Sequence, residues 1–208
     1  MAEQQVFATK GNLILYKKAL KLAALGYELL DRKRNILIRE LMSLVDKAGE
    51  LRGSIEDTYK EAYSALQLAN ISMGLVTPYA NCIPVETGVE ISTRSVMGVE
   101  LPTLRLNTTS PMGLYYDLES TNGTLDVAYL KFNEVKTLTV ELAEVETSVI
   151  RLAEAIQKTQ KRANALGNVQ IPQMQKTIKS IDEVLSERER EEFSRLKVIK
   201  AQKEKEEA

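Results

Sequence analysis

Histidine and tryptophan are both absent from this sequence, and Cys82 is its only cysteine. Without histidine the chain lacks the commonest general base and the commonest metal ligand of proteins. A single cysteine cannot form an intramolecular disulfide, which fits a reducing compartment, and with no basic neighbour Cys82 is expected to be a structural thiol. These absences predict a chain that is not an enzyme, with no catalytic residues and no metal or other cofactor.

Long apolar runs are missing as well. No uninterrupted stretch approaches the roughly 20 apolar residues that a transmembrane helix needs, and the N-terminus has no signal-peptide pattern. The formal net charge is -1, so no overall positive field favours nucleic acid. We therefore expect a cytoplasmic protein with no nucleic-acid partner and no direct membrane insertion.

Glycine and proline are concentrated in the middle of the chain. Residues 74–123 hold five of the ten glycines and four of the five prolines. On either side, apolar residues repeat with the alternating three- and four-residue spacing of a left-handed coiled coil. The sequence predicts an all-α fold in a single elongated domain, 1–208. Its expected parts are a helix over 8–74, a connection over 75–121, and a second helix over 122–203 that folds back antiparallel.

Polar side chains interrupt the first apolar stripe only twice, at Arg34 and Thr58. A helix of an ordinary bundle rarely runs so long, so a coiled coil is favoured. Two interpretations of Arg34 remain open: its guanidinium reaches outward to solvent, or it pairs across the coil and fixes the register of the helices. The stripe runs through Leu13, Tyr16, Leu20, Ala23, Tyr27, Leu30, Leu37, Leu41, Leu44, Ala48, Leu51, Ile55, Ala62, Ala65 and Ala69.

The second stripe is broken at "ALGNVQIP", which contains Gly167 and Pro172, and resumes at Met174. Glycine costs a helix interior about 1 kcal/mol and proline about 3 kcal/mol. The spacing across the break is a heptad plus four residues, a stutter that locally unwinds a left-handed supercoil. The sequence predicts a helix kinked near 167–172, and a short loop with a helix restarting near Pro172 is the alternative.

The pairing of the two helices follows if the first ends near Gly74 and the second begins near Asn122. Small residues then face large ones, because Ala62, Ala65 and Ala69 lie opposite the region of Tyr129, Phe132 and Lys136. Gly26 faces Ile171 and Pro172, where a residue without a side chain makes room for the distorted partner helix.

A β-hairpin is predicted at residues 88–106 inside the connection. Apolar and polar residues alternate on both sides of Met97 and Gly98, which form the turn signal. Pro102 has no N–H to donate, so at least one strand must be an edge. An isolated hairpin is only marginally stable, so this one must pack against the coil or against a partner.

Motifs that carry catalytic chemistry are absent from the sequence. It has no phosphate-binding loop of the P-loop type and no Cys/His spacing for a metal. The carboxylates of "SERERE", residues 186–191, are interpreted as a solvated helix face with ion pairs along the helix.

Several strings together resemble the D subunit of the V-type and A-type rotary ATPases. They are "GYELLDRKRNIL", "SVMGVELP", "TQKRANAL" followed by "IP", "TIKSI", "ERERE" and "FSRLKVIK". They occur in the order found in that family, and the resemblance extends over nearly the whole chain.

The resemblance implies a non-catalytic central-stalk rotor subunit. In that family a coiled coil with both termini inside the ring of catalytic and regulatory nucleotide-binding subunits transmits rotation between ATP turnover and H⁺ or Na⁺ transport. The middle of the chain lies toward the membrane, where the small companion F subunit and a funnel-shaped subunit bind. The protein is then peripheral to the membrane through its complex. The alternatives are a prefoldin-like coiled-coil chaperone subunit, which the polar chain ends disfavour, and a coiled-coil adaptor.

Overall fold

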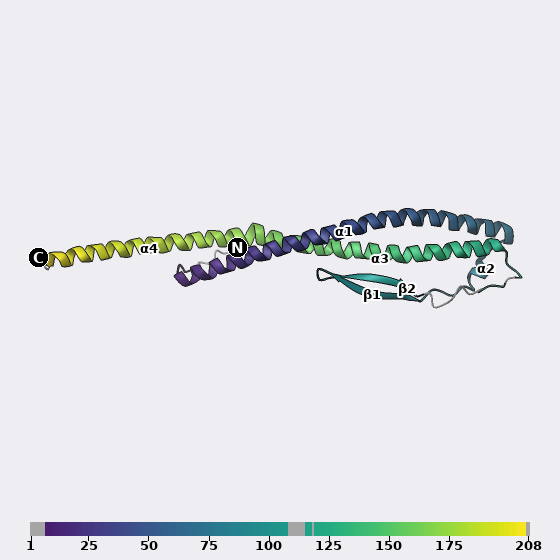
Figure 1. Cartoon of the computed structure of the whole chain (residues 1–208), viewed down its shortest axis with the longest axis horizontal. Helices are drawn as coiled ribbons and strands as arrows, with labels where there is room; N and C mark the ends of the chain where they lie inside the picture. Colours follow the sequence, from purple (N-terminus) through teal and green to yellow (C-terminus); the bar gives the residue numbers. More distant parts are fainter. Residues whose placement is uncertain (1–6, 108–114, 118, 207–208) are drawn as a thin grey trace. The chain divides into compact units, whose positions relative to one another are not determined.

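The computed structural model describes residues 7–107, 115–117 and 119–206 (Figure 1). These residues fall into two compact units. The terminal unit combines Met1–Arg34 with Lys158–Ala208, and the central unit is Asn35–Gln157. The helices are α1 (Lys10–Met73), α2 (Thr77–Ala80), α3 (Gly123–Ala165), the π-helix η1 (Leu166–Gln170) and α4 (Ile171–Glu206), and the strands are β1 (Val89–Val96) and β2 (Val99–Leu106).

The predicted fold class is confirmed. Long helices flank one two-stranded antiparallel sheet, the only sheet in the part of the chain that the structure describes. The connection also contains α2, which the sequence pattern does not predict. This helix has four residues and a proline in its first turn, so it is too short to show a periodic apolar pattern.

Local signals mark the ends of α1. The Thr9 hydroxyl accepts a hydrogen bond from the Asn12 N–H at 3.2 Å, which is an N-cap interaction. At the other end Gly74 adopts a left-handed φ of 81°, and its N–H donates to the carbonyl of Asn70. Glycine is the usual residue after a helix C-terminus because it tolerates this conformation without strain.

In the central unit α1 and α3 pair antiparallel. Ser72 hydrogen-bonds Thr124, Glu61 pairs with Lys131, and Arg52 pairs with Glu146, so residue numbers fall on one helix as they rise on the other. Alanines and branched apolar residues form the buried seam between the helices: Ile55, Ala62, Ala65, Ala69, Leu125, Ala128, Val135 and Val145.

The observed pairing of α1 and α3 lies within about one helical turn of the predicted one: the Arg52–Glu146 pair fits the prediction, whereas Ala69 is offset from it. Ala69 packs with Leu125 and Tyr116 instead of the Tyr129 region. A small residue still packs against a large one here, because Ala69 contacts the buried side chain of Tyr116. The hydroxyl of Tyr116 donates a hydrogen bond to Asp126 at 2.6 Å. Burial and this carboxylate raise the pKa of Tyr116 well above its ordinary value.

In the terminal unit the first part of α1 packs against the end of α3, η1 and α4. Ala163 and Ile181 are buried there, and Lys10 pairs with Glu189 at 2.9 Å. Among the described helices, none is both long enough and apolar enough to cross a membrane.

Candidate interaction sites

The hairpin turns at Met97 and Gly98, the two residues between its strands. Both have positive φ, 51° and 75°, which is typical of the two-residue type I′ turn that follows the natural twist of the strands. Gly98 adopts this conformation without strain, whereas Met97 incurs a steric cost for it.

Pro102 lies on the outer edge of β2. The Asn107 N–H donates to the Gly88 carbonyl at 2.8 Å, and the alternation of an antiparallel ladder then leaves the Pro102–Thr93 pair without mutual hydrogen bonds. The nitrogen of Pro102 therefore points away from β1, where no donor is needed. Side chains of α3 form hydrogen bonds with outward-facing backbone groups of β2. The Leu104 N–H donates to Glu144 at 2.8 Å, and Arg151 donates to the Glu100 carbonyl at 3.0 Å.

The hairpin also contacts both helices of the central unit through its side chains. Leu101 is completely buried and packs with Leu37 of α1 and Leu152 of α3, which are also completely buried. Arg94 pairs with Glu40 of α1 at 3.1 Å. The hairpin is thus held across the α1–α3 pair, which agrees with the sequence argument that it must pack against a support.

Glu86 fixes the base of the hairpin. Its carboxylate accepts hydrogen bonds from Lys136 of α3 at 2.8 Å and from the N–H of Gly88 at 3.1 Å. The Lys136 hydrogen bond is the larger cause, and with the Gly88 N–H it holds the pKa of Glu86 below its ordinary value. This carboxylate therefore remains ionised, and its contacts remain intact, to lower pH than for a free glutamate.

Replacing residues 88–106 by a short Gly/Ser linker is expected to leave the helix content nearly unchanged. The seam between α1 and α3 contains many buried residues outside the hairpin contact, so the helices do not need the hairpin in order to pair. Circular dichroism at 222 nm measures this, with Ile91→Ser as a control because Ile91 is 72% exposed. A collapse of the helical signal in the linker variant would show that the hairpin holds the fold together.

The break predicted near 167–172 is a π-helix rather than a loop. The Ile171 N–H donates to the Leu166 carbonyl, five residues back, so the backbone stays hydrogen-bonded through η1. Pro172 is the second residue of α4 and is half-buried. A π-helical turn accommodates one extra residue in a helix and often occurs at functional positions.

Gly167 is held under an aromatic ring. A Cβ added to this residue would lie 2.8 Å from Cε2 of Tyr27, closer than real contacts allow. Gly26 was predicted to face Ile171 and Pro172, and this is wrong: its nearest neighbour outside its own helix is Leu166, 4.0 Å from an added Cβ. At this level of the coil the pairing lies about one turn from the prediction, since Gly26 meets Leu166 and Tyr27 meets Gly167. Sequence reasoning missed Tyr27 as the partner of Gly167, although its place directly after Gly26 was a usable signal.

Arg34 pairs across the coil. Its guanidinium bonds Asp31 at 2.6 Å and donates to the side-chain oxygen of Gln160 at 2.9 Å. Only 26% of its side chain is exposed, so the outward-reaching interpretation does not describe it.

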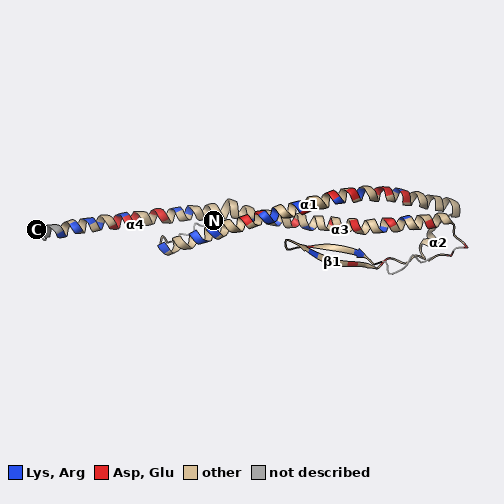
Figure 2. Ribbon diagram, viewed as in Figure 1, with Lys and Arg blue, Asp and Glu red and all other residues tan. Residues whose placement is uncertain are grey.

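The terminal unit exposes many apolar side chains. Leu15, Leu22 and Leu29, spaced by heptads on one face of α1, are 64%, 73% and 66% exposed. On α4 every side chain described from residue 186 to 203 is exposed, and Figure 2 shows charged residues along this stretch. Phe193 and Leu196 are nonetheless 70% and 64% exposed. Such apolar exposure marks surfaces that bind other proteins.

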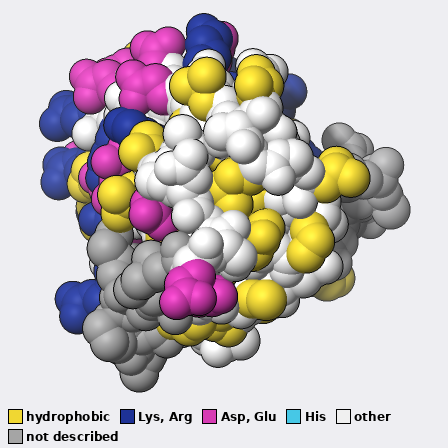
Figure 3. Space-filling model, turned by 90° about the vertical axis from the view of Figure 1, so that its right-hand side faces the viewer, with side chains coloured by type: hydrophobic (Ala, Val, Ile, Leu, Met, Phe, Trp, Pro, Cys, Tyr) yellow, Lys and Arg dark blue, Asp and Glu magenta, His cyan; other side chains and the backbone are white. Residues whose placement is uncertain are grey.

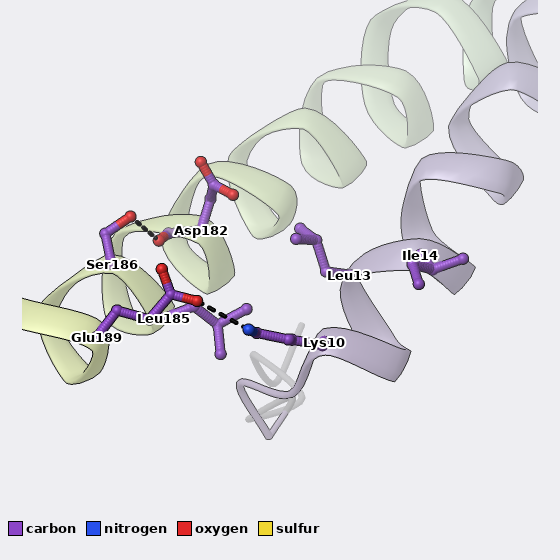
Figure 4. Close-up of a pocket in the computed structure, with 7 residues that line it drawn as sticks. All are labelled: Lys10, Leu13, Ile14, Asp182, Leu185, Ser186 and Glu189. Atoms are coloured by element: carbon purple, nitrogen blue, oxygen red, sulfur yellow. Dashed lines mark hydrogen bonds and ion pairs between the residues drawn. The ribbon is translucent and has the colours of Figure 1, made fainter. Parts of the chain in front are cut away.

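An open hollow of about 280 Å³ lies where α1 begins beside α4 (Figure 4). Leu13, Ile14 and Leu185 form its apolar lining, and the Lys10–Glu189 ion pair closes one side. The ion pair raises the pKa of Lys10 and lowers the pKa of Glu189. These contacts secure the start of α1.

The end of the central unit, where α1 stops and α3 begins, is a second apolar surface. Leu68, Ile71 and Leu75 are 59%, 81% and 83% exposed. Figure 3 shows hydrophobic side chains spread over this face, with charged ones concentrated toward one side. Within the described ranges no group of three His, Cys, Asp or Glu residues could hold a metal ion.

The fold and these surfaces define a coiled-coil protein whose exposed apolar side chains are suited to protein partners. Comparison with known proteins gives the particular family. A family described as the D subunit of ATP synthase matches residues 12–201. The V-type ATP synthase D subunit of Thermotoga neapolitana is 44% identical over 94% of this chain and 97% of its own length. The A-type ATP synthase D subunit of Pyrococcus furiosus is 39% identical over 95% of this chain and 94% of its own.

The chain belongs to the family of ATP synthase D subunits. This confirms the resemblance found in the sequence strings and favours the rotary ATPase prediction over the chaperone and adaptor alternatives.

Proposed function

We propose that this protein is the non-catalytic central-stalk rotor subunit of a V/A-type rotary ATPase. In this role it transmits rotation between ATP turnover in a ring of nucleotide-binding subunits and H⁺ or Na⁺ transport in the membrane. Family membership supports the proposal. In this role the protein lies in the cytoplasm and is peripheral to the membrane through its complex.

The exposed apolar side chains of the terminal unit are the observation that carries the proposal. The heptad-spaced leucines of α1 and the apolar residues near the end of α4 lie on different helices, so a single flat partner would not cover them all. A surrounding ring of catalytic and regulatory subunits would. The ring would contact different side chains around the shaft, which lets one shaft favour different conformations at different catalytic sites.

The apolar surface at the end of the central unit is consistent with binding of the other proposed partners. Leu68, Ile71 and Leu75 are more than half exposed and belong to the middle of the chain. In the proposed orientation this end faces the membrane, where the small companion F subunit and the funnel-shaped subunit would cover it.

A rotation assay tests the function. Cys82 is exposed and is the only cysteine, so a gold nanorod can be attached there through a maleimide linker. We expect the nanorod to rotate on an immobilised ring of purified catalytic and regulatory subunits when ATP is added. It should stay fixed with a non-hydrolysable ATP analogue. ATP hydrolysis by the assembled ring with a stationary nanorod would overturn the rotor role.

A further inference from the structure

Arg34 interrupts an apolar stripe, yet it is folded into a polar layer between two helices. Its guanidinium bonds Asp31 one turn earlier on α1 and donates to the side-chain oxygen of Gln160 on α3. The Gln160 amide in turn donates to Asn164 at 2.9 Å. The side chain of Arg34 is 26% exposed and that of Asp31 is 34% exposed, so both are largely removed from water.

Buried residues border these polar groups. Ala163 is 1% exposed, and Thr159, a buried polar residue next to Gln160, is 6% exposed. A partly buried guanidinium requires acceptors, because removing such a charge from water without giving it partners is strongly unfavourable. Gln160 must therefore lie opposite Arg34 to act as its acceptor, whereas a leucine in the stripe can pack against any apolar neighbour.

A slip of one heptad would keep both apolar stripes in contact. It would move the residue opposite Arg34 from Gln160 to Ala153 or to Gly167. Neither residue has a side-chain acceptor, so in both slipped arrangements Arg34 would lose an acceptor at the position that Gln160 now holds. Most heptad positions on these helices carry similar apolar residues, so apart from the contact of Tyr27 with Gly167 the apolar side chains separate these registers weakly.

We infer that the Arg34–Gln160 polar layer sets the register of α1 against α3 and prevents a heptad slip. It acts by penalising the slipped alternatives, as single polar residues do in coiled coils, and not by adding stability. The inference stands on these contacts and does not rest on the rotor role. A test on the free chain therefore succeeds or fails independently of the rotation assay.

Arg34→Met is the decisive variant, because methionine is apolar, similar in length and continues the stripe. Spin labels at Lys18→Cys and Lys161→Cys, both exposed positions of the terminal unit, report the register in a Cys82→Ser background. The labels are offset along the helix axis, so a slip of seven residues changes their separation by about 10 Å at roughly 1.5 Å per residue. Double electron–electron resonance measures the distance distribution.

We expect one narrow distance population for the parent and a second population, shifted by about one heptad, for Arg34→Met. The melting temperature of Arg34→Met should equal or exceed that of the parent. Arg32→Met is the matched control, because Arg32 is 70% exposed and forms its ion pair with Glu28 of the same helix. The control should keep a single population.

A single, unchanged distance population in Arg34→Met would overturn the inference. A double variant, Arg34→Met with Gln160→Leu, replaces the cross-helix pair by apolar side chains and should also fold with two populations. If neither variant folds, the layer supplies essential stability and does not act as a register device, which overturns the inference as well.

Discussion

Replacing Leu37 by aspartate is expected to lower the free energy of unfolding by at least about 3 kcal/mol. Leu37 is completely buried and packs with Leu101 of β2 and Leu152 of α3. Aspartate would remove these contacts and place a carboxylate in a cluster that consists of apolar side chains. Urea denaturation followed by circular dichroism at 222 nm measures the change.

Met42→Asp is the matched control for this experiment. Met42 lies on the same helix and in the same unit, but it is 63% exposed, so its replacement should change the free energy of unfolding by no more than about 0.5 kcal/mol. Equal losses in the two variants would mean that the Leu37 cluster is not the core of the central unit. The comparison separates the buried position from the effect of adding a negative charge to α1.

Gly167→Ala is expected to destabilise the protein by about 1–3 kcal/mol, although alanine is the better helix former. The new Cβ would lie 2.8 Å from Cε2 and 3.2 Å from Cδ2 of Tyr27, so the ring must move. Thermal unfolding of the variant and the parent measures the loss. In a Tyr27→Ala background the same substitution should instead stabilise the protein, because the obstacle is gone.

Gly49→Ala provides the control for helix propensity. An added Cβ at Gly49 meets no atom within 4 Å, so this substitution should stabilise the protein by up to about 1 kcal/mol. If Gly167→Ala stabilises the protein as Gly49→Ala does, Tyr27 does not constrain η1. The π-helix would then be a tolerated irregularity and not a packed feature of the terminal unit.

A mechanical role for η1 in the proposed rotor can be tested only with this contact taken into account. A straightened helix cannot be obtained simply by placing a larger side chain at Gly167, because Tyr27 occupies that space. Any test of a bend near 167–172 in coupling must therefore alter Tyr27 together with Gly167. Variants that change only Gly167 would confuse a clash with a loss of flexibility.

The sequence by itself determined the local features of this protein. Heptad spacing predicts the long helices because the side of a helix on which a residue lies depends only on its position along the chain. The alternation around Met97 and Gly98 predicted the hairpin for the same reason, and both turn residues have the positive φ of its tight turn. Short sequence motifs that occur along the chain in the order found in the family indicated the family.

Only the tertiary structure decided how distant side chains meet. The pairing at Ala69 and Gly26 was offset from the predicted one by about a turn, because heptad spacing places each stripe on its own helix and does not specify which side chains interlock across the seam. The sequence did not predict the π-helix, nor the contact by which Tyr27 covers Gly167 from another helix. The same holds for Leu101, which sits between Leu37 and Leu152. Its burial arises from packing among residues far apart in sequence, and local periodicity carries no information about such contacts.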